Sequence, residues 1–159
     1  MLGAALAAGA VPCAPARGQR LTAVELGGGL AAVAARHTFA GAELGVGYRP
    51  AGQSRLALAV AAGTEDGRAA ARALLTAQFL LTPAARGGVG LYGGLGAAVA
   101  ARRESAGRGY LAILLGVEAA PGRRGGWYAE LGLCGGVRAA AGWRARRFPA
   151  WWRGAAGGS

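Results

Sequence analysis

The residues from Gly88 to Gly93 match G-x-G-x-x-G, the glycine pattern that holds the pyrophosphate of a dinucleotide. Such a site needs a strand before the motif, a helix after it and an acidic residue about 20 positions later. Here the preceding residues begin with Pro83, and the motif runs on into more glycine-alternating sequence. Because the chain contains 31 glycines, chance matches are expected, and the motif does not predict a dinucleotide site.

Other residue types that perform chemistry are scarce and poorly spaced. His37 is the single histidine of the sequence, and one histidine cannot complete a zinc site with the cysteines Cys13 and Cys134. No serine has the surroundings of a nucleophile elbow. Cys134 fits the pattern of a small apolar residue. The sequence therefore predicts no catalytic residue, no metal site and no cofactor, and we do not expect an enzyme.

Charged residues recur about once in each apolar, glycine-rich segment, and they are the candidates for a functional site. The candidates are Glu25, Glu43, Arg72, Glu118, Glu130 and Arg138. A carboxylate inside a protein needs a cationic or hydrogen-bonding partner. We therefore expect these residues to form a structural network of ion pairs rather than acid–base pairs for catalysis.

An alternating pattern in the sequence predicts the elements that position these charges. Ala42, Leu44 and Val46 alternate with Glu43 and with glycines, so a strand here has one apolar face and one face of small or charged residues. Regular strands of this kind, separated by turn residues, are typical of a sandwich or a barrel. The predicted strands are 21–35, 39–49, 55–63, 70–82, 88–101, 110–119, 127–137 and a last one within 138–148.

The segment 70–82 fits two secondary structures. As a helix it places Leu74, Leu75 and Gln78 at a spacing of three and four residues, and Pro83 would end it. As a strand it alternates like its neighbours. We expect a strand, because one helix among strands would leave two sheet edges unpaired.

The predicted strand face opposite the large apolar residues is unusual for a soluble protein. It carries Gly, Ala and scattered charges, and the chain is 53% hydrophobic with a mean hydropathy of +0.31. Such a face suits the inside of a narrow barrel whose leucines and valines face lipid, where the sheet must close to pair every backbone group. We predict an all-β fold, a closed antiparallel up-and-down transmembrane β-barrel of about eight strands, filled by side chains rather than open as a pore.

The N-terminal residues resemble an export signal. Residues 1–16 combine the short apolar run 2–11, the helix-breaking Pro12 and the small residues of Ala14-Pro15-Ala16, which fit a signal-peptidase site. Aromatic residues at predicted strand ends suit the two membrane interfaces. These residues are Tyr48, Tyr110, Trp127, Trp143 and Phe148.

Together, these features resemble the small bacterial outer-membrane β-barrels of the OmpA/OmpX-like group. The resemblance covers 21–148 and rests on the export signal, dyad strands such as 42–48, the short turn Pro121-Gly122 and the aromatic Phe148 in the final strand. It implies an outer-membrane location and no shared catalytic set. We expect a monomer in the lipid bilayer, with arginine-rich loops touching lipopolysaccharide phosphates, and a disordered tail at 149–159.

The net charge of +11 does not indicate a nucleic-acid partner. The sequence pattern places many arginines in turns, namely Arg49, Arg55, Arg86, Arg123 and Arg124. Two other interpretations stay open. One is a soluble, secreted, lipocalin-like barrel that binds a small apolar ligand. The other is a spurious reading frame, since antisense frames of GC-rich genomes are also rich in Ala, Gly and Arg, although the ordered alternation argues against it.

Overall fold

The computed structural model describes residues 21–103 and 105–154, so the predicted signal peptide at 1–16 lies outside the described residues. The described residues form eight strands followed by a short helix. The elements are β1 (Ala23–Ala34), β2 (Thr38–Ala51), β3 (Ser54–Glu65), β4 (Arg68–Leu80), β5 (Val89–Arg102), β6 (Ser105–Ala119), β7 (Gly125–Leu133), β8 (Val137–Arg147) and α1 (Ala150–Gly154). Within the described part of the chain, no helix has the length and apolar character needed to cross a membrane.

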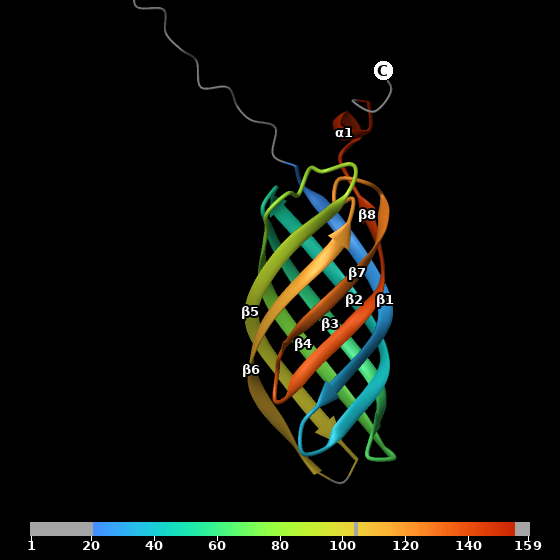
Figure 1. The fold of residues 1–159 in the computed structure, drawn as a ribbon, viewed down its shortest axis with the longest axis vertical. Helices are drawn as coiled ribbons and strands as arrows, with labels where there is room; N and C mark the ends of the chain where they lie inside the picture. The colour runs from blue at the N-terminus through green and yellow to red at the C-terminus, as the bar shows by residue number, and fades with distance from the viewer. Residues whose placement is uncertain (1–20, 104, 155–159) are drawn as a thin grey trace, which may run out of the picture.

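The strands close into a single barrel, as predicted (Figure 1). Each strand pairs antiparallel with its neighbour in sequence, and β8 pairs with β1 to complete the cylinder. The ambiguous segment 70–82 falls largely in strand β4, which pairs with β3 on one side and with β5 on the other. Strand β4 thus hydrogen-bonds to both neighbouring strands, whereas a helix at this position would leave the edges of β3 and β5 unpaired.

The two ends of the barrel differ. The terminal end carries the two terminal segments of the described chain and the β2–β3, β4–β5 and β6–β7 turns; the distal end carries the other connections (Figure 1). Strand β6 pairs with β5 as far as Ser105, but with β7 only from Ile113 to Glu118. The β7–β8 hairpin therefore stops short, and the barrel wall is lower there at the distal end (Figure 1).

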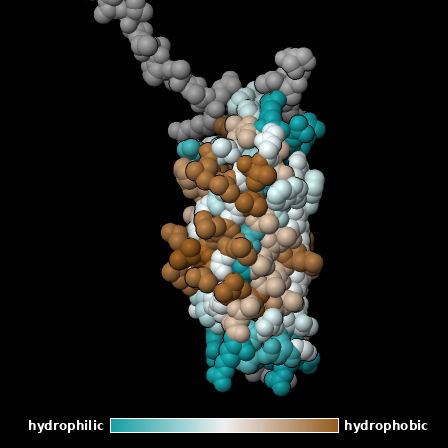
Figure 2. Space-filling model, viewed as in Figure 1, coloured by the Kyte–Doolittle hydropathy of each residue, from teal (hydrophilic) through white to brown (hydrophobic). Residues whose placement is uncertain are grey.

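The large apolar side chains lie on the outside of the barrel. Leu44, Leu58 and Leu91 are 69%, 43% and 55% exposed, whereas the neighbouring Glu43 is 6% exposed. Figure 2 shows apolar side chains along the wall and hydrophilic ones toward both ends. A lipocalin-like soluble barrel would keep such side chains inside. The structure therefore disfavours that alternative and places the apolar face where a bilayer would meet it.

Outward aromatic side chains gather near the terminal end rather than at both ends. They are Tyr48, Phe79, Trp127 and Trp143. Trp127 and Trp143 are register partners on β7 and β8. The prediction was wrong for two residues: Tyr110 packs against the interior core, and Phe148 is buried with Leu21 and Ala23.

The tail after β8 differs from the expected disorder over residues 150–154, which form α1. The ring of Trp152 lies 6.0 Å from that of Phe148, and its indole N–H donates to the Gly122 carbonyl at 3.0 Å. Arg86 lies over the same indole and donates to the Trp152 carbonyl at 2.9 Å. These contacts attach α1 to the terminal end, and residues 155–159 lie outside the described residues.

Candidate functional site in the barrel lumen

All six candidate residues lie on the inward face of their strands. Glu25 is on β1, Glu43 on β2, Arg72 on β4, Glu118 on β6, Glu130 on β7 and Arg138 on β8. Five of them are less than 9% exposed, and Arg72 is partly buried. Strand alternation produces this placement, since each candidate shares its parity with the other inward-facing residues of its strand. The six do not form one cluster but contribute to three groups of ion pairs.

The first group surrounds Glu118. Its carboxylate accepts from four guanidinium groups: Arg49 at 3.1 Å, Arg55 at 2.9 Å, Arg144 at 2.7 Å and Arg146 at 2.9 Å. The Glu118 side chain is 1% exposed, and none of the four arginines exceeds 10%. A carboxylate this deep is stable only because so many charge-assisted hydrogen bonds replace its lost water.

A second carboxylate, Glu25, completes this group. It pairs with Arg49, with Arg55 at 3.1 Å and with Arg144 at 3.6 Å. Four guanidinium groups and two carboxylates leave a formal excess of +2 in this group, from 4 − 2. Glu130, 3.4 Å from Arg144, offsets part of that excess and links the first group to the second.

None of the four arginines of this group is among the candidates from the sequence. The sequence pattern counts Arg49 and Arg55 among the turn arginines, although they end and begin predicted strands; in the structure they lie inside β2 and β3 and are 0% and 1% exposed. Their parity was a usable signal, because Arg49 alternates in step with Glu43. Arg144 and Arg146 likewise follow Arg138 in even steps along β8.

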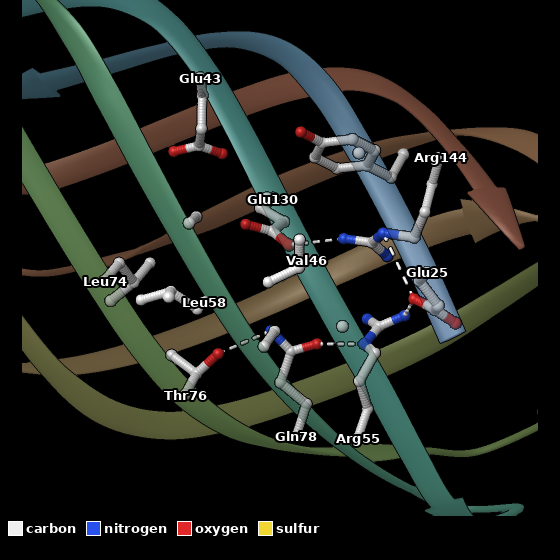
Figure 3. Close-up of a pocket in the computed structure, with 16 residues that line it drawn as sticks. Glu25, Glu43, Val46, Arg55, Leu58, Leu74, Thr76, Gln78, Glu130 and Arg144 are labelled. Atoms are coloured by element: carbon white, nitrogen blue, oxygen red, sulfur yellow. Dashed lines mark hydrogen bonds and ion pairs between the residues drawn. The ribbon is translucent and has the colours of Figure 1, made fainter. Parts of the chain in front are cut away.

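The second group lies around Glu130. Arg138 donates to Glu43 at 2.6 Å and lies 3.5 Å from Glu130. The Tyr92 hydroxyl donates to Glu130 at 2.7 Å. The lumen beside these residues contains a cavity of about 30 Å³, between Glu43, Glu130 and Arg144 (Figure 3). That volume holds little more than a water molecule or two, so the lumen is filled at this level.

A chain of hydrogen bonds orients Arg55 toward the carboxylates. The Arg55 Nε–H donates to Gln78 at 2.6 Å, and the Gln78 amide donates to the Thr76 hydroxyl at 2.9 Å (Figure 3). Thr76 and Gln78 occupy successive inward positions of β4, which places their side chains next to each other. Arg55 also lies over the ring of Tyr92, 4.4 Å from its centroid.

The ring of Tyr92 occupies the space that a side chain at Gly116 would need, since a Cβ there would overlap the ring. We expect Gly116→Ala to lower the free energy of unfolding by about 1–3 kcal/mol, because the displaced ring must leave Glu130. Urea unfolding in detergent micelles measures this. Gly109→Ala on the same strand, where a Cβ would meet open space, is the control and should change stability little. Equal losses for both variants would contradict the packing role of Gly116.

Apolar residues also fill the lumen, which differs from the predicted filling of small and charged side chains. Val33 and Phe39 near the distal end are 1% and 0% exposed, and Leu74 and Leu114 are buried with them. Phe39 is an odd-numbered residue of β2, so the alternation that turns Glu43 inward turns this ring inward too. Together with the ion pairs, these side chains occupy the middle of the barrel.

Two turns cover the terminal end of the lumen. Arg49 donates to the carbonyl of Pro83 in the β4–β5 turn and to that of Pro121 in the β6–β7 turn, both at 3.3 Å. Pro121 is fully buried. A Cβ at Gly90 would meet the Pro121 ring at 2.8 Å, which shows how closely this turn packs on β5. The same arginine thus joins the covering turns to the first group of ion pairs.

The third group lies at the distal end. Arg72 is 3.8 Å from Glu65 of β3 and donates to the carbonyl of Cys134 at 3.4 Å. Its guanidinium also lies over the ring of Phe39, 5.2 Å from the centroid. Among the residues described, no set of three or more metal-binding side chains comes together.

Comparison with solved structures agrees with this architecture. The N-terminal β-barrel domain of Pseudomonas aeruginosa OprF matches with a TM-score of 0.64 and 16% identity over 79% of this chain and 97% of that one. The outer membrane protein OprG from the same organism matches with a TM-score of 0.66 and 11% identity, over 82% and 98%. Neisserial surface protein A matches with a TM-score of 0.57 and 15% identity, over 78% and 96%. No protein-family model and no curated protein matches the chain.

These matches define the class of the fold. The chain has the fold of the small eight-strand outer-membrane β-barrels, and at the level of fold the resemblance to the OmpA/OmpX-like group is confirmed. The exposed apolar wall and the predicted outer-membrane location agree with this class. At sequence identities of 11–16%, these matches support the fold alone. Any function has to be argued from the residues of this chain.

Proposed function

We propose that this protein is a non-enzymatic, monomeric barrel of the outer membrane with a structural or surface role and a lumen closed to solutes. The observation that carries the proposal is the filled interior. The terminal turns, the Glu118 group and the apolar layer around Phe39 follow one another along the lumen. A small barrel whose interior is occupied in this way has no continuous water path.

The outer surface supports the membrane location. The strands contain 9 to 15 residues, enough for a tilted crossing, which takes about 9–11. Exposed leucines and valines occur on all eight strands, as Leu26, Leu56 and Leu131 illustrate. Barrel closure pairs the backbone, which hydrocarbon could not do. A contiguous apolar wall of this extent on a water-soluble monomer would cause aggregation.

The proposed surface role includes contact with lipopolysaccharide phosphates at the distal end. Arg68 and Arg103 are exposed there, at the start of β4 and just after β5. A guanidinium presents its donors as a planar fork that matches phosphate oxygens. These arginines support the proposal by charge and position.

Conductance tests the closed lumen. We expect the purified protein, reconstituted in a planar bilayer bathed in concentrated KCl, to show no stepwise current. The physical reason is that ions would have to displace the buried network around Glu118, which is 1% exposed. Faster migration of unheated than heated protein on a gel would show that the reconstituted barrel is folded. Regular, reproducible current steps from folded protein would contradict the proposal.

A further inference from the structure

The distal mouth of the barrel contains a cavity that a closed structural barrel does not require. This distal vestibule has a volume of about 280 Å³, close to the lower end of the range of about 300–1,000 Å³ for small-molecule sites. Four arginines from separate segments line it: Arg36 before β2, Arg72 on β4, Arg102 on β5 and Arg108 on β6. The vestibule thus collects guanidinium groups that lie far apart in the sequence.

The charge of the distal vestibule is strongly positive. Among the described residues that line it, Glu65 is the single acid, so four arginines and one glutamate give a formal charge of +3, from 4 − 1. His37 also lines the vestibule, but its ring pairs with the carboxylate of Asp66. Asp66 in turn accepts from the Thr38 backbone N–H at 3.1 Å, and this bond and the His37 contact lower the pKa of its carboxyl group. Asp66 does not line the vestibule, but Arg102 lies close enough to lower the pKa of its carboxyl group further, so Asp66 offsets part of the positive charge at the mouth.

Several contacts hold Arg72 in place at the floor of the distal vestibule. Arg72 is held there by Glu65, by the Cys134 carbonyl and by the ring of Phe39, and its side chain is 12% exposed. Its Nε–H is buried without a hydrogen-bond partner in the described structure. Because Phe39 is 0% exposed directly below, the vestibule opens to the distal side and is closed toward the lumen.

We propose that the distal vestibule binds an anion that carries phosphate groups. Guanidinium groups from separate segments can engage several oxygens at once, and phosphate offers them bidentate geometry that a chloride ion lacks. A ligand with more than one negative charge matches the formal charge of +3. This proposal concerns a site other than the exposed Arg68 and Arg103, neither of which lines the vestibule. It is also independent of the closed lumen, because a barrel can be closed to ions whether or not its mouth holds a ligand.

The phosphate can belong to a soluble molecule or to a lipid headgroup. The vestibule is lined by inward-facing residues such as Arg72 and Arg102, which a soluble anion reaches along the barrel axis. The short β7–β8 hairpin lowers the wall on one side, near Gly135, and gives a headgroup a lateral approach. The two sources share one chemistry and are separated by the experiment.

The experiment measures binding of inorganic tripolyphosphate to the purified full-length protein in zwitterionic micelles by titration calorimetry. We expect saturable binding with one site per chain, weakened by about tenfold or more in the double variant Arg102→Gln/Arg108→Gln. The control is Arg123→Gln/Arg124→Gln, which removes the same charge from exposed positions at the terminal end. Unheated gel mobility shows that each variant is folded.

A second arm uses nanodiscs of phosphatidylcholine that contain a minor fraction of phosphatidic acid. Enrichment of phosphatidic acid around the protein, lost in the distal variant and kept in the control, assigns the site to a lipid headgroup. Saturable tripolyphosphate binding with the same variant pattern and no lipid enrichment assigns it to a soluble anion. Equal weakening of tripolyphosphate binding in both double variants, or no saturable binding in either arm, would overturn the proposal. Conductance is measured separately, so failure here leaves the closed lumen untouched.

Discussion

Replacing Glu118 by Gln is expected to lower the free energy of unfolding in detergent micelles by about 3–5 kcal/mol. Four buried guanidinium groups share this carboxylate at 2.7–3.1 Å, and its loss leaves them with Glu25 and the more distant Glu130. Uncompensated charge in a dry interior is far more costly than a lost surface pair. Equilibrium urea unfolding, followed by tryptophan fluorescence, measures the change.

A matched control for Glu118 exists at the distal end. In the described structure Glu65 makes one ion pair, with Arg72 at a distance of 3.8 Å. Glu65→Gln should therefore lower the free energy of unfolding by less than about 1 kcal/mol. A double-mutant cycle of Glu118→Gln with Arg146→Gln should show coupling of about 0.5–3 kcal/mol, because the two side chains are 2.9 Å apart. If Glu118→Gln cost no more than Glu65→Gln, the ion pairs would not be what holds the lumen together.

Placing a charge on the apolar wall should have the next largest effect. Leu44→Arg is expected to cost about 2–4 kcal/mol in lipid vesicles, as an arginine does near the middle of a bilayer. Leu44 lies midway along β2, paired in register with Gly28 and Val60, and is 69% exposed. Guanidinium chloride unfolding of the protein reconstituted in vesicles gives the value.

The control for Leu44 is another outward position, Thr64, near the distal end of β3. Thr64→Arg should cost about 0–1 kcal/mol, because an arginine at the membrane boundary keeps its water. A similar cost at both positions would contradict a membrane centred on the leucines. A large cost at Thr64 with none at Leu44 would shift the bilayer toward the distal end.

Which side chains face lipid and which face the lumen was predictable, because successive side chains on a strand point to opposite faces. Once Leu44 was assigned outward, Glu43 had to face inward, and the structure places both residues in this way. The same rule, applied to the neighbouring segments, predicted a closed barrel, because a sheet with one lipid-facing side must pair all its edges. These inferences depend on local sequence alone.

The partners across the lumen could not be predicted in this way. Glu118 meets Arg49 and Arg55, which are 69 and 63 positions away, and their meeting depends on how the strands are staggered around the barrel. Arg49 and Arg55 also stand on either side of the predicted turn at 50–53, so they counted as turn arginines, whereas β2 continues to Ala51 and β3 begins at Ser54. Stagger and strand length are properties of the closed sheet, and single segments do not encode them.

The tail illustrates a second limit. Trp152 is held by Gly122 and Arg86, which belong to turns between strands far from it in sequence. Nothing in the composition of 149–159 indicates these contacts, because a helix as short as α1 forms only where it can pack. Tertiary contacts therefore decide its structure.

The most direct test of the central claim is the accessibility of spin labels in a lipid bilayer. Spin labels are placed at Leu44→Cys and Leu58→Cys, with Ala57→Cys as the inward control, in a background that carries Cys13→Ala and Cys134→Ala. The measurement compares their collisions with oxygen and with a water-soluble nickel chelate. We expect high oxygen and low nickel accessibility at positions 44 and 58, and low accessibility to both at position 57. Nickel accessibility at positions 44 and 58 equal to that of an exposed turn site would contradict a barrel whose leucines face lipid.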